Sequence, residues 1–134
     1  MTRGLRNNNP LNMRHDRDTW KGEVKPGQDA AFKQFRTMAW GYRAAFKLLH
    51  NYQRLHGCRT LADFIRRWAP PSENNTDAYI RIVAQRSGLS DTSPIDTLDG
   101  QVMQRIVAAM SQVENGTPAD ASEVAEGWAL FCEG

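Results

Sequence analysis

The chain has 134 residues and a formal net charge of +2, from 17 Lys and Arg against 15 Asp and Glu. Hydrophobic residues make up 40% and charged residues 24%, which is typical of a globular domain, so we expect a single domain over residues 1–134. The nearly balanced charge argues against nucleic-acid binding, and no apolar segment approaches the about 20 residues that cross a bilayer. We therefore expect no nucleic-acid partner and no stable membrane insertion.

An asparagine-rich segment opens the chain, with three asparagines before Pro10 and then Asn12 and Arg14. Asparagine side chains compete with the backbone for hydrogen bonds and favour turns, and Pro10 pushes Asn9 toward extended geometry. We expect an irregular loop in which Asn9, Asn12 and Arg14 contact the hydroxyl and acetamido groups of a sugar. The alternative is a structural loop whose amides cap nearby backbone groups.

The rest of the chain predicts a mainly α (α+β) fold, with a small β-hairpin lobe followed by helices. Short extended segments at 11–14, 20–24 and 31–35 surround the turn at Pro26-Gly27 and form the expected lobe. From residue 38 the apolar residues recur at helical spacing between start and stop signals. The predicted helices run from Met38 to Gly57, Thr60 to Pro70, Thr76 to Gly88, about Asp99 to Glu114, and from Ser122 onward.

Glu114 is the candidate catalytic acid, because it ends a strongly apolar predicted helix just before Asn115-Gly116. A carboxyl group at the rim of the core is partly desolvated, and the helix dipole disfavours an anion at a C-terminus. Both effects favour the protonated carboxyl that a general acid needs to protonate a glycosidic oxygen. The alternative is an exposed glutamate tolerated at the surface.

A second candidate region follows Trp68, where a proline-stiffened loop leads to a helix that carries Tyr79. Glu73 and Asn74 in this loop are suited to contact substrate, and Tyr79 is suited to stack on a sugar or to hold the catalytic acid. In the alternative interpretation, Glu73 stabilises the helix N-terminus and Tyr79 packs in the core.

The metal-binding residue types show no ligand spacing. Cys58 and Cys132 are far apart and match no zinc pattern, and the three histidines form no H-E-x-x-H motif. We therefore expect neither a metal nor a cofactor. We expect two free thiols, although Cys58 and Cys132 could pair in an oxidising compartment.

Several segments between about residues 3 and 116 carry a family resemblance: Arg6–Pro10, Asn12–Arg14, Gly41–Ala44, Ala69–Asn74 with Thr76, and Glu114–Gly116. They resemble small phage and prophage proteins with the motif R-N-N-N-P-G-N-I-R, which are described as virion structural or lysozyme-like proteins. This chain has Leu11 where that motif has glycine and Met13 where it has isoleucine, and neither change removes a polar group.

The order of segments is also similar to that of bacterial N-acetylglucosaminidases of the flagellar and autolysin type. These have a lysozyme-like fold and an E-S-G motif immediately before an N-L-F-G-I-K segment. Here the matching asparagine-rich segment opens the chain, while Glu114-Asn115-Gly116 lies near its end. The resemblance therefore implies a circularly permuted lysozyme-like domain, with Glu114 as the catalytic acid and Tyr79 as the active-site tyrosine.

From this resemblance we expect a glycosidase that cleaves β-1,4 bonds of the peptidoglycan glycan strand, either a muramidase or glucosaminidase or a lytic transglycosylase. A hydrolase needs a second carboxylate about 5 Å or 6.5–9.5 Å from the acid, whereas a transglycosylase needs only one. The candidates for a second group are Glu23, Asp29 and Glu73. The alternative function is a non-catalytic phage virion structural or wall-binding protein.

The expected protein is a monomer whose partner is the glycan strand. Its first residues encode no secretory signal. We therefore expect synthesis in the bacterial cytoplasm and action on the cell wall after release or delivery, including delivery by a virion.

Overall fold

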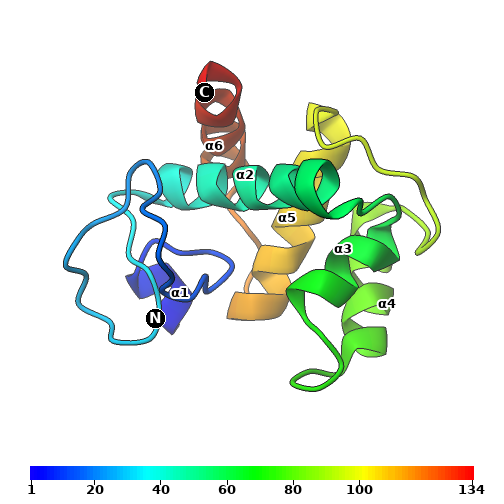
Figure 1. The fold of residues 1–134 in the computed structure, drawn as a ribbon, viewed down its shortest axis with the longest axis horizontal. Coiled ribbons are helices and arrows are strands. Elements are labelled where there is room, and N and C mark those ends of the chain that lie inside the picture. The colour runs from blue at the N-terminus through cyan, green and yellow to red at the C-terminus, as the bar shows by residue number, and fades with distance from the viewer.

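The computed structural model describes residues 1–134, and it is mainly helical, as the sequence predicts. Its helices are α1 (Arg3–Arg6), α2 (Met38–His56), α3 (Leu61–Trp68), α4 (Thr76–Ser87), α5 (Gly100–Asn115) and α6 (Ala121–Glu133). The long helix α2 crosses the middle of the molecule, with α6 along one side of it and α5 across the other (Figure 1). Helices α3 and α4 lie at one end, and the N-terminal segment lies at the other.

The helix boundaries follow local capping signals, because each cap satisfies backbone groups that the helix leaves free. Thr60 and Asp63 form the predicted capping box at the start of α3. Gly88 and Gly116 end α4 and α5 with left-handed φ values of 74° and 72°. Two predicted starts are displaced by one or two residues. The N-caps of α4 and α6 are Asn75 and Asp120, whose side chains accept the free amides, in place of Thr76 and Ser122.

The predicted β-hairpin lobe is wrong in its detail, because residues 7–37 form no continuous strand ladder. Two isolated bridges, Arg14 with Phe32 and Glu23 with Phe35, are the pairings found there. A short helix, α1, precedes this lobe and was not predicted from the sequence. The extended segments do lie side by side, but each pairs for too few residues to form a sheet.

A buried ion pair organises this irregular lobe. The side chains of Lys33 and Glu23 are both 0% exposed, and Lys33 Nζ lies 3.1 Å from Glu23 Oε1. The same ammonium lies 3.0 Å from Asp16 Oδ1 and donates to the main-chain carbonyl of Asp18. The lobe therefore encloses a buried ion pair in addition to the apolar side chains of Leu11, Met13 and Phe35.

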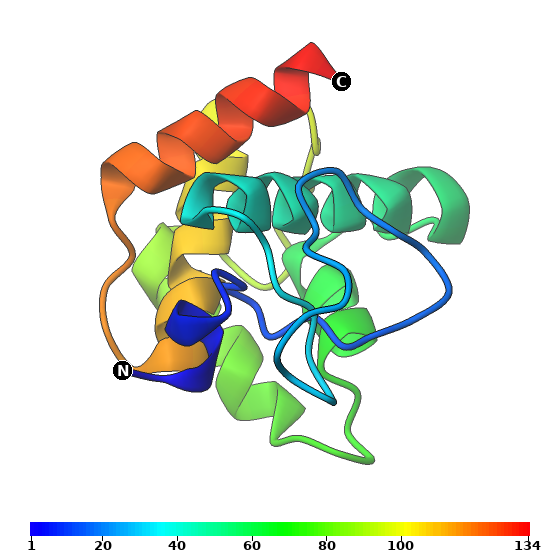
Figure 2. The same cartoon turned by 90° about the vertical axis from the view of Figure 1, so that its left-hand side faces the viewer.

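The apolar core lies between α2 and the other helices. Buried residues of α2, including Tyr42, Phe46 and Leu49, pack with Ile106 and Met110 of α5. Helix α6 lies directly on α2 (Figure 2) because it presents a glycine there. A Cβ atom at Gly127 would lie 2.5 Å from the Tyr42 Cβ atom. None of the helices is long and apolar enough to span a membrane.

Asp29 ties helix α1 to the lobe. Its carboxylate accepts two hydrogen bonds from the Arg3 guanidinium, at 2.6 and 2.8 Å, and another from Asn7. The backbone amides of Ala31 and Phe32 also donate to it. The Arg3 hydrogen bonds, with the smaller contributions of Ala31 and Asn7, hold the pKa of Asp29 well below its usual value of 3.8.

We expect this carboxylate to make stability depend on pH in the acid range. Because the folded protein binds the Asp29 proton less tightly than the unfolded chain, the contribution is complete above the usual pKa of 3.8 and is lost as the pH falls below it. Asp29→Asn should therefore be less stable than wild type at pH 7, with a smaller difference at pH 3. Urea unfolding at both pH values measures this, and an unchanged difference would contradict it.

Candidate functional site

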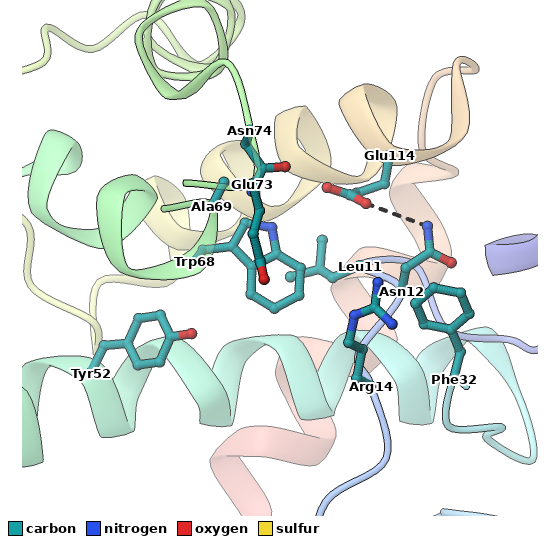
Figure 3. Close-up of a pocket in the computed structure, with 10 residues that line it drawn as sticks. All are labelled: Leu11, Asn12, Arg14, Phe32, Tyr52, Trp68, Ala69, Glu73, Asn74 and Glu114. Carbon is teal, nitrogen blue, oxygen red and sulfur yellow. Dashed lines mark hydrogen bonds between the residues drawn. The ribbon is translucent and has the colours of Figure 1, made fainter. Parts of the chain in front are cut away.

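A cleft of about 570 Å³ separates the N-terminal lobe from the loop between α3 and α4 (Figure 3). It contains five of the seven side chains that the sequence analysis assigned to a site. The residues that line it are Leu11, Asn12, Arg14, Phe32, Tyr52, Trp68, Ala69, Glu73, Asn74 and Glu114. They come from segments far apart in the chain, so the cleft exists only in the folded protein.

Glu114 lies half-buried in the last turn of α5 and faces the cleft. The Tyr79 hydroxyl donates to its Oε2 at 2.9 Å, and the Asn12 side-chain amide donates to its Oε1 at 3.3 Å. Since each oxygen has its own donor, the plane of the carboxyl group is fixed. The left-handed turn at Gly116 ends the helix directly after this residue and leaves the carboxyl accessible from the cleft.

Tyr79 lies behind Glu114 and does not line the cleft. It is buried, and its hydroxyl accepts a hydrogen bond from Trp68 Nε1 at 3.2 Å. Burial raises the pKa of Tyr79, and the nearby negative charge of Glu114 raises this pKa further. The phenol therefore keeps its proton and donates it in the hydrogen bond to Glu114. Of the two roles considered from the sequence, this geometry fits holding the acid and not stacking on a sugar.

We expect Tyr79→Phe to lower the free energy of unfolding by about 1 kcal/mol, the usual net value of a hydrogen bond between buried groups. The change leaves the Trp68 indole N–H without its acceptor and Glu114 Oε2 without its donor. Urea unfolding measures the loss. Tyr52→Phe is the matched control, because it removes the hydroxyl of a tyrosine that lines the cleft. Equal losses in both variants would contradict the assignment.

In the asparagine-rich loop, Asn12 lines the cleft and Asn9 is buried within the loop. Asn12 has a left-handed φ of 54°, which asparagine tolerates, and its amide reaches Glu114 across the cleft (Figure 3). Its Oδ1 atom is buried without a hydrogen-bond partner. Asn9 does not line the cleft. It is wholly buried, and its side chain donates to the carbonyls of Met13 and Lys33 and accepts from the Met13 amide. Asn9 therefore shapes the loop.

Asn115 anchors the N-terminal segment to the end of α5, a role that the sequence did not indicate. Its side-chain amide donates to the Pro10 carbonyl at 2.9 Å, and its Oδ1 accepts from the Thr2 hydroxyl at 2.8 Å. A Cβ atom at Gly4 would lie 2.5 Å from the same Oδ1. The close approach of α1 to α5 therefore depends on glycine at position 4, and it brings Asn12 to Glu114.

Aromatic and cationic side chains form the walls of the cleft. The Arg14 guanidinium carbon lies 4.9 Å from the centre of the Phe32 ring on the lobe side. Tyr52 and Trp68 lie toward the other end of the cleft (Figure 3). Phe32 and Tyr52 were not predicted as site residues, because an aromatic residue within a core-like pattern carries no signal that it faces a cleft.

The structure separates the three candidates for a second carboxylate. Glu23 is buried against Lys33, and Asp29 is engaged by Arg3, so neither lines the cleft. Glu73 and Asn74 lie exposed on the loop after α3 and do line it. Glu73 is therefore the second acidic residue of the cleft, beside Glu114.

Fold and site together define a mainly helical protein with a cleft built around one carboxylate held by a tyrosine and an asparagine. No family model matches the chain. The chain is 35% identical over 135 residues to Protein P5 of Pseudoalteromonas phage PM2, an alignment that covers 96% of this chain and 82% of the relative. The chain belongs to the family of this phage protein, which confirms the predicted phage association.

Proposed function

We propose that this phage protein binds the glycan strand of peptidoglycan in its cleft and cleaves a β-1,4 bond there, with Glu114 as the general acid. The observation that carries the proposal is the environment of Glu114, which is half-buried at the cleft and oriented by Tyr79 and Asn12. A general acid must lie within hydrogen-bond reach of the substrate, and Glu114 is held in a fixed orientation at the wall of the cleft.

In this mechanism Glu114 protonates the oxygen of the scissile bond as that bond breaks. Tyr79 acts as a positioning residue, because it contacts Glu114 and not the cleft. Asn12 is a second positioning residue, because its side-chain amide donates to Glu114 Oε1 at 3.3 Å.

Two routes complete the reaction. In hydrolysis, Glu73 would serve as the second carboxylate, as base or nucleophile. In the transglycosylase route, Glu114 first protonates the leaving oxygen, and its carboxylate then takes the proton of the substrate's own hydroxyl as that oxygen bonds to the sugar carbon, so Glu114 is the only carboxylate required. The products differ, because hydrolysis leaves a reducing end and transglycosylation leaves a 1,6-anhydro end.

We further propose that the fold is lysozyme-like and circularly permuted. In the glucosaminidases that the sequence resembles, the acidic motif immediately precedes the asparagine-rich segment. Here the two are separated by about a hundred residues, yet Asn12 contacts Glu114 and Pro10 contacts Asn115. These contacts support a permutation, because they bring the asparagine-rich segment and the acidic motif together in space. In the glucosaminidases the same two segments are adjacent in the sequence.

A second candidate function is a non-catalytic structural or wall-binding component of the phage virion. Membership in the family of a phage protein favours it, and the name of that relative states no enzymatic activity. The same cleft would then hold a glycan strand without cutting it, since a fold and a groove do not by themselves establish catalysis.

Incubation with purified peptidoglycan tests these functions. We expect the wild-type monomer to lower the turbidity of the suspension and to release fragments whose ends mass spectrometry assigns to one of the two routes. Co-sedimentation without clearing would instead favour the wall-binding function. A protein that neither clears nor co-sediments would contradict both.

A further inference from the structure

A polar hollow of about 340 Å³ shares no residue with the cleft around Glu114. We name it the Arg43 pocket. It is formed where the loop around residue 20 meets helix α2, in the region where that loop passes α2 in Figure 2. The residues that line it are Asp18, Thr19, Trp20, Lys21, Arg43, Lys47 and Asn51.

Arg43 is the unusual residue of this pocket. It is only 6% exposed, yet its Nε atom has no hydrogen-bond partner. The ion pairs of the structure join Arg3 to Asp29, Lys25 to Glu23, and Lys33 to Asp16 and Glu23, so none of them neutralises Arg43. A buried guanidinium without a counter-charge is costly, because charged groups are rarely buried unless they are paired. Burial lowers the pKa of Arg43.

A second buried donor lines the same pocket. The indole Nε1 of Trp20 is also buried without a partner. Arg43, Lys47 and Asn51 are spaced four residues apart, which places them along one face of α2. Lys21 lies beside them and donates to the Gly134 carbonyl. Asp18 is the one acidic residue in the lining, so cations exceed anions by three to one.

We propose that the Arg43 pocket binds a phosphate group, either as free phosphate or as the headgroup of an anionic lipid. The observations favour an anionic ligand with several acceptor oxygens, because three cationic side chains line one hollow and the buried Arg43 among them has no ion-pair partner. A tetrahedral phosphate accepts from guanidinium and ammonium donors at the same time. This site is independent of the proposed glycan cleavage, since the two pockets have no residue in common.

The first test measures thermal stability of the full chain during titration with inorganic phosphate, at ionic strength held constant with chloride. We expect the Tm of wild type to rise with phosphate and then saturate, because a ligand that binds only the folded state stabilises it. Arg43→Met should need at least about tenfold more phosphate for the same effect, as expected for the loss of a charged hydrogen-bonding partner. Arg54→Met is the matched control, because Arg54 is exposed on the same helix outside the pocket.

The stability of Arg43→Met without phosphate separates ligand binding from a structural role. Methionine keeps the apolar stem of the side chain and removes a buried charge that has no protein partner. We therefore expect this variant to be at least as stable as wild type in phosphate-free buffer. A large loss of stability there would show that the guanidinium supports the fold, and it would overturn the proposal.

Flotation with vesicles distinguishes the two sources of phosphate. Binding to phosphatidylglycerol vesicles but not to phosphatidylcholine vesicles, weakened by Arg43→Met, assigns the pocket to a lipid headgroup. A phosphate effect without vesicle binding assigns it to a soluble phosphate. Lys47→Gln provides a milder variant that should weaken binding severalfold. A wild-type protein that responds to neither ligand, or variants that respond as wild type does, would overturn the proposal.

Discussion

Replacing Glu114 by Gln should lower the rate of glycan cleavage by about 10²- to 10⁴-fold, the usual contribution of a general acid. Glutamine has the same shape, and its carbonyl oxygen still accepts a hydrogen bond from Tyr79 or Asn12. The amide cannot supply a proton to the leaving oxygen, so turnover is lost while the fold and glycan binding remain. The measurement is the rate of fragment release from purified peptidoglycan, together with co-sedimentation and urea unfolding of the variant.

Glu73→Gln is the matched control for this experiment, because it removes the other carboxylate of the same cleft. A comparable loss of activity with reducing ends in the wild-type products indicates a hydrolase with two carboxylates. A small loss with 1,6-anhydro ends indicates the transglycosylase route. Full activity in Glu114→Gln would refute the assignment of the acid. Absence of activity in wild type, with binding retained, would leave the virion wall-binding function as the better account.

Replacing Lys33 by Met should destabilise the protein by about 3–5 kcal/mol, the cost of removing one partner of a buried ion pair. Methionine fills the space of the lysine stem, but Glu23 keeps a charge that is wholly buried. The main-chain carbonyl of Asp18 also loses its donor. The measurement is urea unfolding at pH 7, where the carboxylate is ionised in the unfolded chain.

Two further variants test the cause of this loss. Lys33→Met combined with Glu23→Gln should recover much of the stability, because the uncompensated charge is gone and glutamine can still accept from the Trp20 amide. Lys25→Met should change stability by less than about 0.5 kcal/mol, since Lys25 is 44% exposed and lies 4.0 Å from Glu23. A double variant no more stable than Lys33→Met would show that lost packing, and not charge, is the cause.

The helices could be predicted from the sequence because their signals are local. The capping box of Thr60 and Asp63 and the glycines at 57, 88 and 116 fix helix ends through hydrogen bonds within a few residues. Where a start was misplaced, a neighbouring cap competed. Asn75 precedes Thr76, and both residue types accept a helix amide well.

The N-terminal lobe could not be predicted in detail because long-range contacts determine it. The sequence of its extended segments predicts strands. In the structure, Lys33 is buried and forms ion pairs with Glu23 and Asp16. The side chain of Asn9 also donates a hydrogen bond to the Lys33 carbonyl. A lysine within an apolar pattern indicates an exposed position, so no pattern predicts that it is the centre of the lobe. Helix α1 is only four residues long and was missed for that reason.

The candidate site could be predicted only in part from the sequence. Glu114 and Tyr79 were singled out by position and by family resemblance, and the structure places them 2.9 Å apart through their side-chain oxygens. Asn12 was expected to contact substrate, and its contact with Glu114 spans 102 residues of sequence. Spacing along the chain carries no information about such a contact, and for the same reason Phe32 and Tyr52 were missed.

The anchoring of the first residues to the end of α5 also bears on how the protein is made. Thr2, Pro10 and Asn12 leave the ribosome early, but their partners Glu114 and Asn115 follow more than a hundred residues later. At about 5–20 residues per second, this delay is roughly 5–20 seconds. During that time the end of α5, to which the N-terminal segment binds, has not yet been synthesised. The cleft is therefore completed only after α5 has been synthesised.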